Sequence, residues 1–96
     1  MTQAGMGTYQ INDDDVVWRT AERDDEIVVL ELSTSTYLTL NGSAKILWET
    51  LADGASGEVL TSALVSRFAI PEDRAASDVS AFLSTAVERG LVVELE

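Results

Sequence analysis

Few residues of this sequence could carry out covalent chemistry. The chain has no histidine and no cysteine, although histidine is the commonest general base and metal ligand near neutral pH and cysteine supplies thiolate nucleophiles. A single lysine, Lys45, is left as an amine nucleophile. These absences argue against an enzyme and exclude disulfides and thiolate metal sites. We therefore expect a non-catalytic protein without a cofactor.

Three successive aspartates, Asp13 to Asp15, are the one local cluster that could suggest a metal site. Calcium loops, however, place their ligands at alternate positions and require a distal bidentate carboxylate. We interpret the run as a solvated stretch that ends a flexible acidic tail over residues 1–15. The remaining residues, 16–96, are expected to form a single domain, because a chain of this length has too little interior to divide.

The charge balance restricts the partners of the protein. Six basic residues stand against 17 acidic ones, which gives a net charge of −11. This charge repels phosphate backbones and disfavours nucleic acid, while it favours a partner that carries lysine or arginine. No apolar run approaches the roughly 20 residues that span a bilayer, and the first residues do not resemble a signal peptide. We expect a cytoplasmic protein that does not bind membranes.

Three stretches with strand periodicity precede three with helical periodicity. The predicted strands are Val16–Thr20, Ile27–Leu32 and Thr36–Leu40. The middle stretch is apolar on nearly both faces, which is typical of a central strand. The three strands should form an antiparallel meander with Thr36–Leu40 at its edge, where a row of N–H and C=O groups stays unpaired.

Capping residues mark the expected helices. Asn41 to Ser43 precede a helix over Ala44–Leu51, Ser56 caps a second one that ends near Phe68, and Pro71 opens a third one that stops at Gly90. A short strand or extended arm should follow. The sequence thus predicts an α+β fold with a three-stranded antiparallel sheet followed by three helices, in an arrangement like a winged helix-turn-helix.

Two stretches resemble a known family. They are VVLELSTSTYLTLNGSAKILWETLADG, which begins at Val28, and DVSAFLSTAVERGLV, which begins at Asp78. Both are similar to the pyrroloquinoline quinone biosynthesis protein D family of RiPP recognition elements, and most of all to the stand-alone members from lasso peptide clusters. The positions that carry the resemblance are Glu31, Ser35, Tyr37, Leu40, Asn41, Trp48, Gly54, Asp78, Val79, Phe82, Leu83, Gly90 and Leu91. Two of these depart from the pattern, since Ser35 stands where glycine is usual and Glu31 where aspartate is commoner.

The resemblance implies a module that captures the leader of a ribosomally made precursor peptide. The leader would add as a strand to the Thr36–Leu40 edge, in a groove beside the last helix, and in lasso peptide systems would be presented to a transglutaminase-like leader peptidase and a cyclase. The implied contacts on the strand are Thr36, Tyr37, Leu38, Thr39 and Leu40. Those on the helix are Arg74, Asp78, Ala81, Phe82 and Thr85.

Several alternatives remain open at this point. Asp78 is either a solvated helix carboxylate or the partner of a leader lysine or arginine, and Phe82 meets either the core or the groove floor. Trp18 and Trp48 fit core anchors better than a ligand platform. At the level of function, the alternatives are a peptide chaperone for pyrroloquinoline quinone biosynthesis and an acidic winged-helix regulatory or scaffold subunit. The few arginines on the helices argue against DNA binding.

Overall fold

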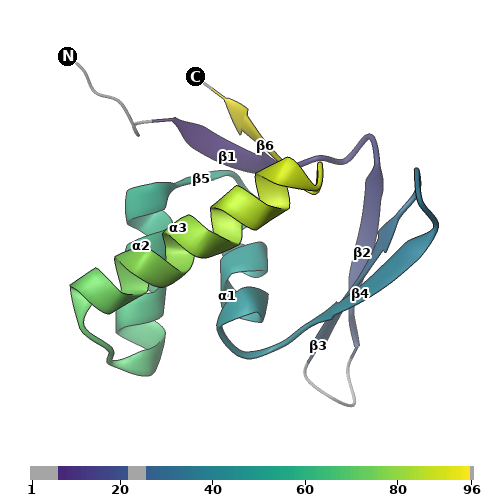
Figure 1. Cartoon of the computed structure of the whole chain (residues 1–96). Helices are drawn as coiled ribbons and strands as arrows, with labels where there is room; N and C mark the ends of the chain where they lie inside the picture. Colours follow the sequence, from purple (N-terminus) through teal and green to yellow (C-terminus); the bar gives the residue numbers. More distant parts are fainter. Residues whose placement is uncertain (1–6, 22–25, 96) are drawn as a thin grey trace.

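The computed structural model describes residues 7–21 and 26–95. Figure 1 shows three helices on one side of the molecule and a twisted antiparallel sheet on the other, with a second small sheet above the helices. In chain order the elements are β1 (Thr8–Ile11), β2 (Val16–Ala21), β3 (Glu26–Glu31), β4 (Thr36–Leu40), α1 (Gly42–Leu51), β5 (Ala55–Ser56), α2 (Gly57–Phe68), α3 (Glu72–Glu88) and β6 (Val92–Leu95).

The larger sheet confirms the predicted meander. Its strand order is β2-β3-β4, both pairings are antiparallel, and β3 is the central strand. Ile27, Val29 and Glu31 of β3 are buried on the face toward the helices, while Val28 and Leu30 on the other face are only half-buried. Within the described ranges, β4 pairs with β3 alone and is therefore an edge strand.

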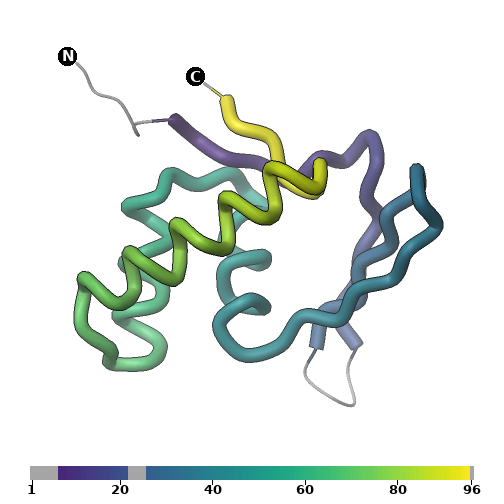
Figure 2. The backbone as a smooth tube through the Cα atoms, in the orientation of Figure 1, coloured from purple at the N-terminus to yellow at the C-terminus, as the bar shows by residue number. Residues whose placement is uncertain are grey.

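The prediction of a single sheet is wrong, because β1 forms a second sheet of order β5-β1-β6. The prediction of a loose tail is wrong at residues 8–11, because these residues form β1. Residues 1–6 of the predicted tail lie outside the described ranges. The backbone in Figure 2 runs β1 alongside β6, so the first and the last described strands lie side by side. The N–H of Asn12 also donates to the carbonyl of Leu91 at 2.9 Å. A winged helix-turn-helix arrangement stays a prediction.

Asp15 is not part of a solvated run but fixes the turn between β3 and β4. Its two carboxylate oxygens accept hydrogen bonds from the N–H and the hydroxyl of Ser33, each at 2.9 Å. Ser35 in the same turn has a φ of 55°, a left-handed conformation that glycine adopts at lower cost. The described ranges hold no group of three acidic side chains placed to bind a metal.

Local capping explains where the helices begin and end. The hydroxyl of Ser56 accepts a hydrogen bond from the N–H of Val59 at 3.2 Å, which confirms the predicted cap of α2. Asn41 stands at the N-cap of α1, but its side-chain oxygen accepts no capping hydrogen bond; its amide nitrogen donates to Glu26 at 3.3 Å. Pro71 precedes α3, and Gly90 follows it with a φ of 80° that stops the helix.

The core lies between the sheet and the helices, around Trp48 of α1. Trp48 is 1% exposed and meets Trp18 of β2 edge to face, with ring centroids 6.2 Å apart. The core prediction for both tryptophans is thus confirmed, although Trp18 is only half-buried. Leu47 and Leu51 of α1 and Leu60 and Leu64 of α2 complete the centre. No described helix is both long and apolar enough to cross a bilayer.

One ion pair ties the end of α3 to the sheet. Nη2 of Arg89, the residue after α3, donates to Oε1 of Glu31 on β3 at 2.9 Å. Glu31 is 4% exposed and lies on the buried face of its strand. A buried carboxylate without a partner is costly, so this contact both satisfies Glu31 and sets where the last turn of α3 lies.

We predict that Arg89→Met lowers the free energy of unfolding by about 1 to 2 kcal/mol, because it leaves the Glu31 carboxylate buried and unpaired. The effect stays modest because the Arg89 side chain is 42% exposed. Urea unfolding followed by tryptophan fluorescence measures it. The control is Glu49→Gln, which breaks the i,i+4 pair with Lys45 within α1, where the Glu49 side chain is 42% exposed, and should cost roughly 0.5 kcal/mol or less. Equal losses for both variants would contradict a structural role for the Arg89 contact.

Candidate peptide-binding site

The hydrogen-bond register decides which backbone groups of β4 stay unpaired. The N–H of Leu32, just after β3, donates to the carbonyl of Asp15 beside β2 at 2.8 Å. Alternate residues of a strand turn their backbone groups to the same side. Leu30 and Val28 therefore also pair with β2, and the residues between them pair with β4.

The remaining β3 residues are Ile27, Val29 and Glu31, which lie opposite Leu40, Leu38 and Thr36 of β4. These three β4 residues thus use their backbone groups within the sheet. Tyr37 and Thr39 consequently direct their N–H and C=O groups outward, away from β3. The edge presents two donors and two acceptors in the spacing that an added antiparallel or parallel strand requires.

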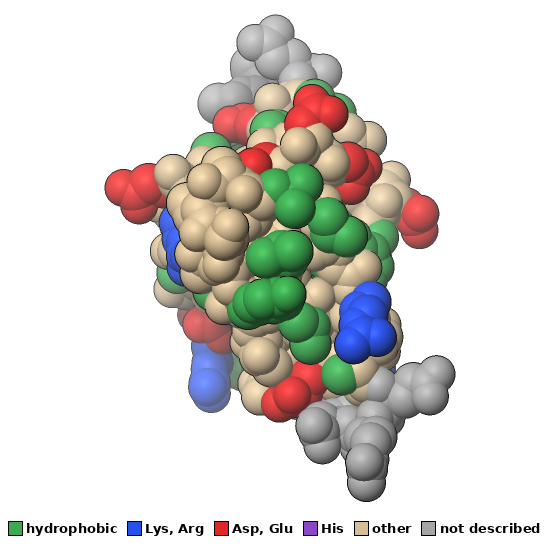
Figure 3. All heavy atoms as spheres, turned by 90° about the vertical axis from the view of Figure 1, so that its right-hand side faces the viewer, with side chains coloured by type: hydrophobic (Ala, Val, Ile, Leu, Met, Phe, Trp, Pro, Cys, Tyr) green, Lys and Arg blue, Asp and Glu red, His purple; other side chains and the backbone are tan. Residues whose placement is uncertain are grey.

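The side chains of β4 alternate between the two faces of the sheet. Leu38 and Leu40 are half-buried and pack against the core, on the side of the helices. Tyr37 is 69% exposed and lies on the outer face, in one cross-strand row with Leu30 and Val17. Figure 3, which looks onto the side of the molecule that this sheet forms, shows hydrophobic side chains gathered in the middle. The ring of Tyr37 therefore faces away from α3.

The ion pair of Arg89 identifies the flank of α3 that faces the sheet. Arg89, Thr85, Phe82 and Asp78 are spaced by four, three and four residues, so they form one stripe along the helix. The first of them contacts Glu31, which lies opposite Thr36 of β4. The stripe thus turns toward the β2-β3-β4 sheet, and the sequence alone did not determine this.

The other predicted helix residues differ in their positions relative to this stripe. Phe82 is half-buried and packs against the core, whereas Asp78, Thr85 and Ala81 are exposed. Ala81 lies beside the stripe, farther from the core. Arg74 belongs to the first turn of α3, roughly 22 Å along the axis from Arg89 at 1.5 Å per residue. That turn lies over α2 in Figure 1, away from β4, so the structure does not bring Arg74 to the strand edge.

Sequence reasoning missed Glu31 and Arg89, although a signal was present. Glu31 continues the alternation of Ile27 and Val29 on the buried face of β3, and a charged residue in such a position requires a partner. A hollow lies elsewhere, between α2, α3, β1 and β6 on the opposite flank of α3.

The described site suits the binding of an extended peptide. It combines two outward backbone units on β4 with a helix stripe that carries one carboxylate and one aromatic ring. Backbone units of this kind recognise a strand irrespective of its sequence, and side chains on a neighbouring helix provide selection.

The chain is similar to known proteins both in sequence and in structure. The solved structure of TbiB1 in complex with the TbiA(beta) leader peptide is similar to the chain, with a TM-score of 0.77 and 28% sequence identity. The similarity covers 86% of this chain and 93% of TbiB1. None of the curated proteins compared with the chain matches it. The family model for coenzyme PQQ synthesis protein D matches residues 26–92, from the start of β3 to the start of β6. The chain therefore belongs to the PqqD family.

Proposed function

We propose that this protein binds the leader segment of a ribosomally synthesised precursor peptide, as a strand added to β4. The observation that carries the proposal is the open edge of β4, where the backbone groups of Tyr37 and Thr39 point outward. The similarity to TbiB1 in complex with a leader peptide supports leader binding by this chain. The protein acts here as a RiPP recognition element and not as a catalyst.

Affinity and selectivity have separate sources in this arrangement. Hydrogen bonds to Tyr37 and Thr39 hold any extended segment, because they involve only backbone groups. Leader side chains that point toward α3 meet the Phe82 ring and the Asp78 carboxylate, with Thr85 beside them. A leader with an apolar residue and a lysine or arginine at alternate positions would satisfy both groups. Leu38 and Leu40 support the edge from inside the sheet, and Thr36 begins it.

The proposal extends to the pathway. The resemblance to stand-alone members from lasso peptide clusters supports a role in which the bound leader is presented to a transglutaminase-like peptidase and then to a cyclase, in the cytoplasm. The family match to coenzyme PQQ synthesis protein D supports a second candidate function, that of a chaperone for the pyrroloquinoline quinone precursor peptide. Calorimetric titration with one leader of each kind distinguishes the two, because only the cognate leader should bind at micromolar concentration or below.

We predict that Thr39→Pro weakens leader binding at least about tenfold while the protein stays folded, because proline removes an outward donor that the sheet itself does not use. Isothermal titration calorimetry measures the affinity and circular dichroism the fold. Leu38→Pro is expected to destabilise the fold instead, since it removes a bond to β3.

Thr39→Val is the matched control, because it keeps the backbone N–H and the β-branched shape. It should bind the leader as the unchanged protein does. A folded Thr39→Pro variant with unchanged affinity would show that the leader does not pair with this edge.

We predict that Asp78→Asn weakens binding of a leader that carries lysine or arginine by about 1 kcal/mol, or roughly fivefold, at an unchanged melting temperature. The change keeps the shape of the side chain and removes its charge. Asp53→Asn, in the exposed turn after α1, removes the same charge away from the stripe and serves as the control. If both variants lose affinity equally, the effect is one of net charge and Asp78 makes no specific contact.

A further inference from the structure

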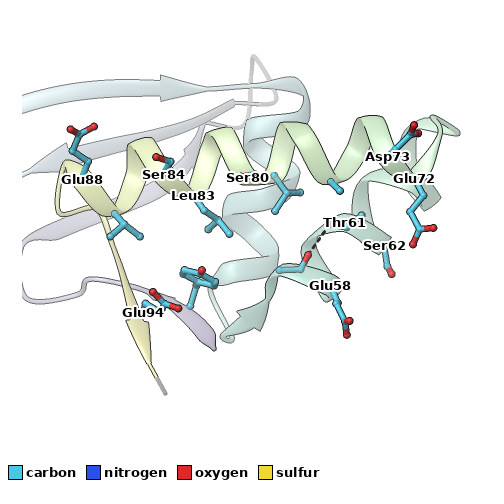
Figure 4. A pocket seen from close by; sticks show the side chains of 15 residues that line it. Glu58, Thr61, Ser62, Glu72, Asp73, Ser80, Leu83, Ser84, Glu88 and Glu94 are labelled. Carbon is cyan, nitrogen blue, oxygen red and sulfur yellow. Dashed lines mark hydrogen bonds between the residues drawn. The ribbon is translucent and has the colours of Figure 1, made fainter. Parts of the chain in front are cut away.

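A broad hollow lies on the flank of α3 that faces away from β4. It has a volume of about 1160 Å³ and is walled by α2 and α3, with β1 and β6 at one end (Figure 4). Its lining comprises Tyr9, Gly57, Glu58, Thr61, Ser62, Glu72, Asp73, Ala76, Val79, Ser80, Leu83, Ser84, Val87, Glu88 and Glu94. The leader site described above uses none of these residues.

The floor of the hollow is apolar and lies close to the solvent. Val79 and Leu83 are buried beneath it, and Val87 is 39% exposed. Ala76, Ser80 and Ser84 follow one another every four residues along α3. Small side chains in such a row let another helix approach closely, because ridges of one helix then fit the groove of the other.

The margin of the hollow is acidic. Five carboxylates line it, namely Glu58, Glu72, Asp73, Glu88 and Glu94, and no lysine or arginine is among the lining residues. Figure 4 shows Glu88 and Glu94 toward one end and Glu72 and Asp73 toward the other, with Leu83 and Ser80 between them. The hydroxyl of Tyr9 is hydrogen-bonded to Glu94, and burial followed by the charge of Glu94 raises the pKa of Tyr9. The tyrosine therefore stays protonated and neutral and adds no negative charge of its own to this surface.

Shape and charge together restrict the occupant. A second copy of the chain would bring a net charge of −11 against an acidic margin and would be repelled, as would nucleic acid or an anionic membrane. The long walls are helices, whose backbone groups are already paired, so they offer nothing to an extended peptide. From Glu72 to Glu88 the wall is about 24 Å long at 1.5 Å per residue, the length of a helix of roughly 16 residues.

We propose that this hollow docks an amphipathic helix of a partner protein, with an apolar stripe on Val79, Leu83 and Val87 and with lysine or arginine beside the five carboxylates. The identity of the partner rests on the proposed function, because we take the partner to be the enzyme that receives the leader. The hollow and the β4 edge lie on opposite flanks of α3, so helix and leader bind at the same time. One domain would thereby hold substrate and enzyme on the two sides of one helix.

The probe is a synthetic amphipathic helix of about 16 residues made of leucine and lysine, long enough to span the wall at 1.5 Å per residue. The control for charge alone is a peptide of the same composition in scrambled order, whose helix would have no continuous apolar face. Titration of the full-length, ¹⁵N-labelled protein with each peptide locates the binding surface. The amphipathic helix should shift amide signals of Ser62, Ser80 and Ser84 and should bind at least about tenfold more tightly than the scrambled peptide.

Two tryptophan variants on opposite flanks of α3 separate this proposal from the leader site. Ser80→Trp fills the hollow from an exposed position. It should lower the affinity for the helical peptide at least about tenfold, while the affinity for the leader stays unchanged. Ala81→Trp, at the next residue and beside the Asp78, Phe82 and Thr85 stripe, should lower the affinity for the leader and leave the affinity for the helical peptide unchanged. Asp13→Asn with Asp14→Asn, two exposed changes outside the hollow, control for net charge and should alter helix binding less than about twofold.

Each outcome bears on one proposal only. Equal binding of the helical and scrambled peptides, or indifference of the helix to Ser80→Trp, would overturn the docking site while leader binding still stood. Absence of leader binding to the unchanged protein would overturn the proposed function. In that case, tight helix binding at the hollow would still establish the surface, with a partner other than a leader-processing enzyme.

Discussion

The register of β3 between its two neighbours is the constraint on which the candidate site depends. One hydrogen bond, from the N–H of Leu32 to the carbonyl of Asp15, assigns alternate residues of β3 to β2 and the others to β4. The carboxylate of Asp15 also holds Ser33 in the turn that follows. A shift of one residue in this pairing would turn every side chain of the strand to the other face. The backbone N–H and C=O groups of Leu38 would then point outward in place of those of Tyr37 and Thr39.

The position of α3 depends on a second constraint, which is the need of a buried carboxylate for a partner. Glu31 lies on the face of β3 that meets the helices, and Arg89 reaches it from the end of α3. This contact orients the stripe of Asp78, Phe82 and Thr85 toward the sheet. The same orientation leaves the other flank of α3 open over an apolar floor with acidic margins. One helix therefore separates two surfaces of different chemistry.

Local patterns predicted the larger sheet and the helices closely. The strand Thr36–Leu40, the helix start at Ser56 and the helix stop at Gly90 were correct because period, caps and turn residues are properties of neighbouring positions. The second sheet was missed because Thr8–Ile11 is short and pairs with Val92–Leu95 at the far end of the chain. A local pattern contains no information about so distant a partner.

The site was predicted less completely, for reasons that are geometric. The helical period gives the angle of a residue around the axis, so the sequence placed Arg74, Ala81 and Thr85 in one sector beside Asp78. It does not show which element that side faces, and Arg74 was included although its turn lies over α2. The direction of the backbone groups at Tyr37 and Thr39 required a hydrogen bond between strands, which no sequence pattern reveals.

Amide hydrogen exchange at β4, measured residue by residue with and without a leader peptide, tests the central claim most directly. The account predicts that the N–H groups of Tyr37 and Thr39 exchange fast in the free protein and become protected when the leader binds, whereas Leu38 is protected in both states. Protection of Tyr37 and Thr39 already in the free protein would contradict the assigned register. Fast exchange at both residues in a saturated complex would show that the leader binds away from this edge.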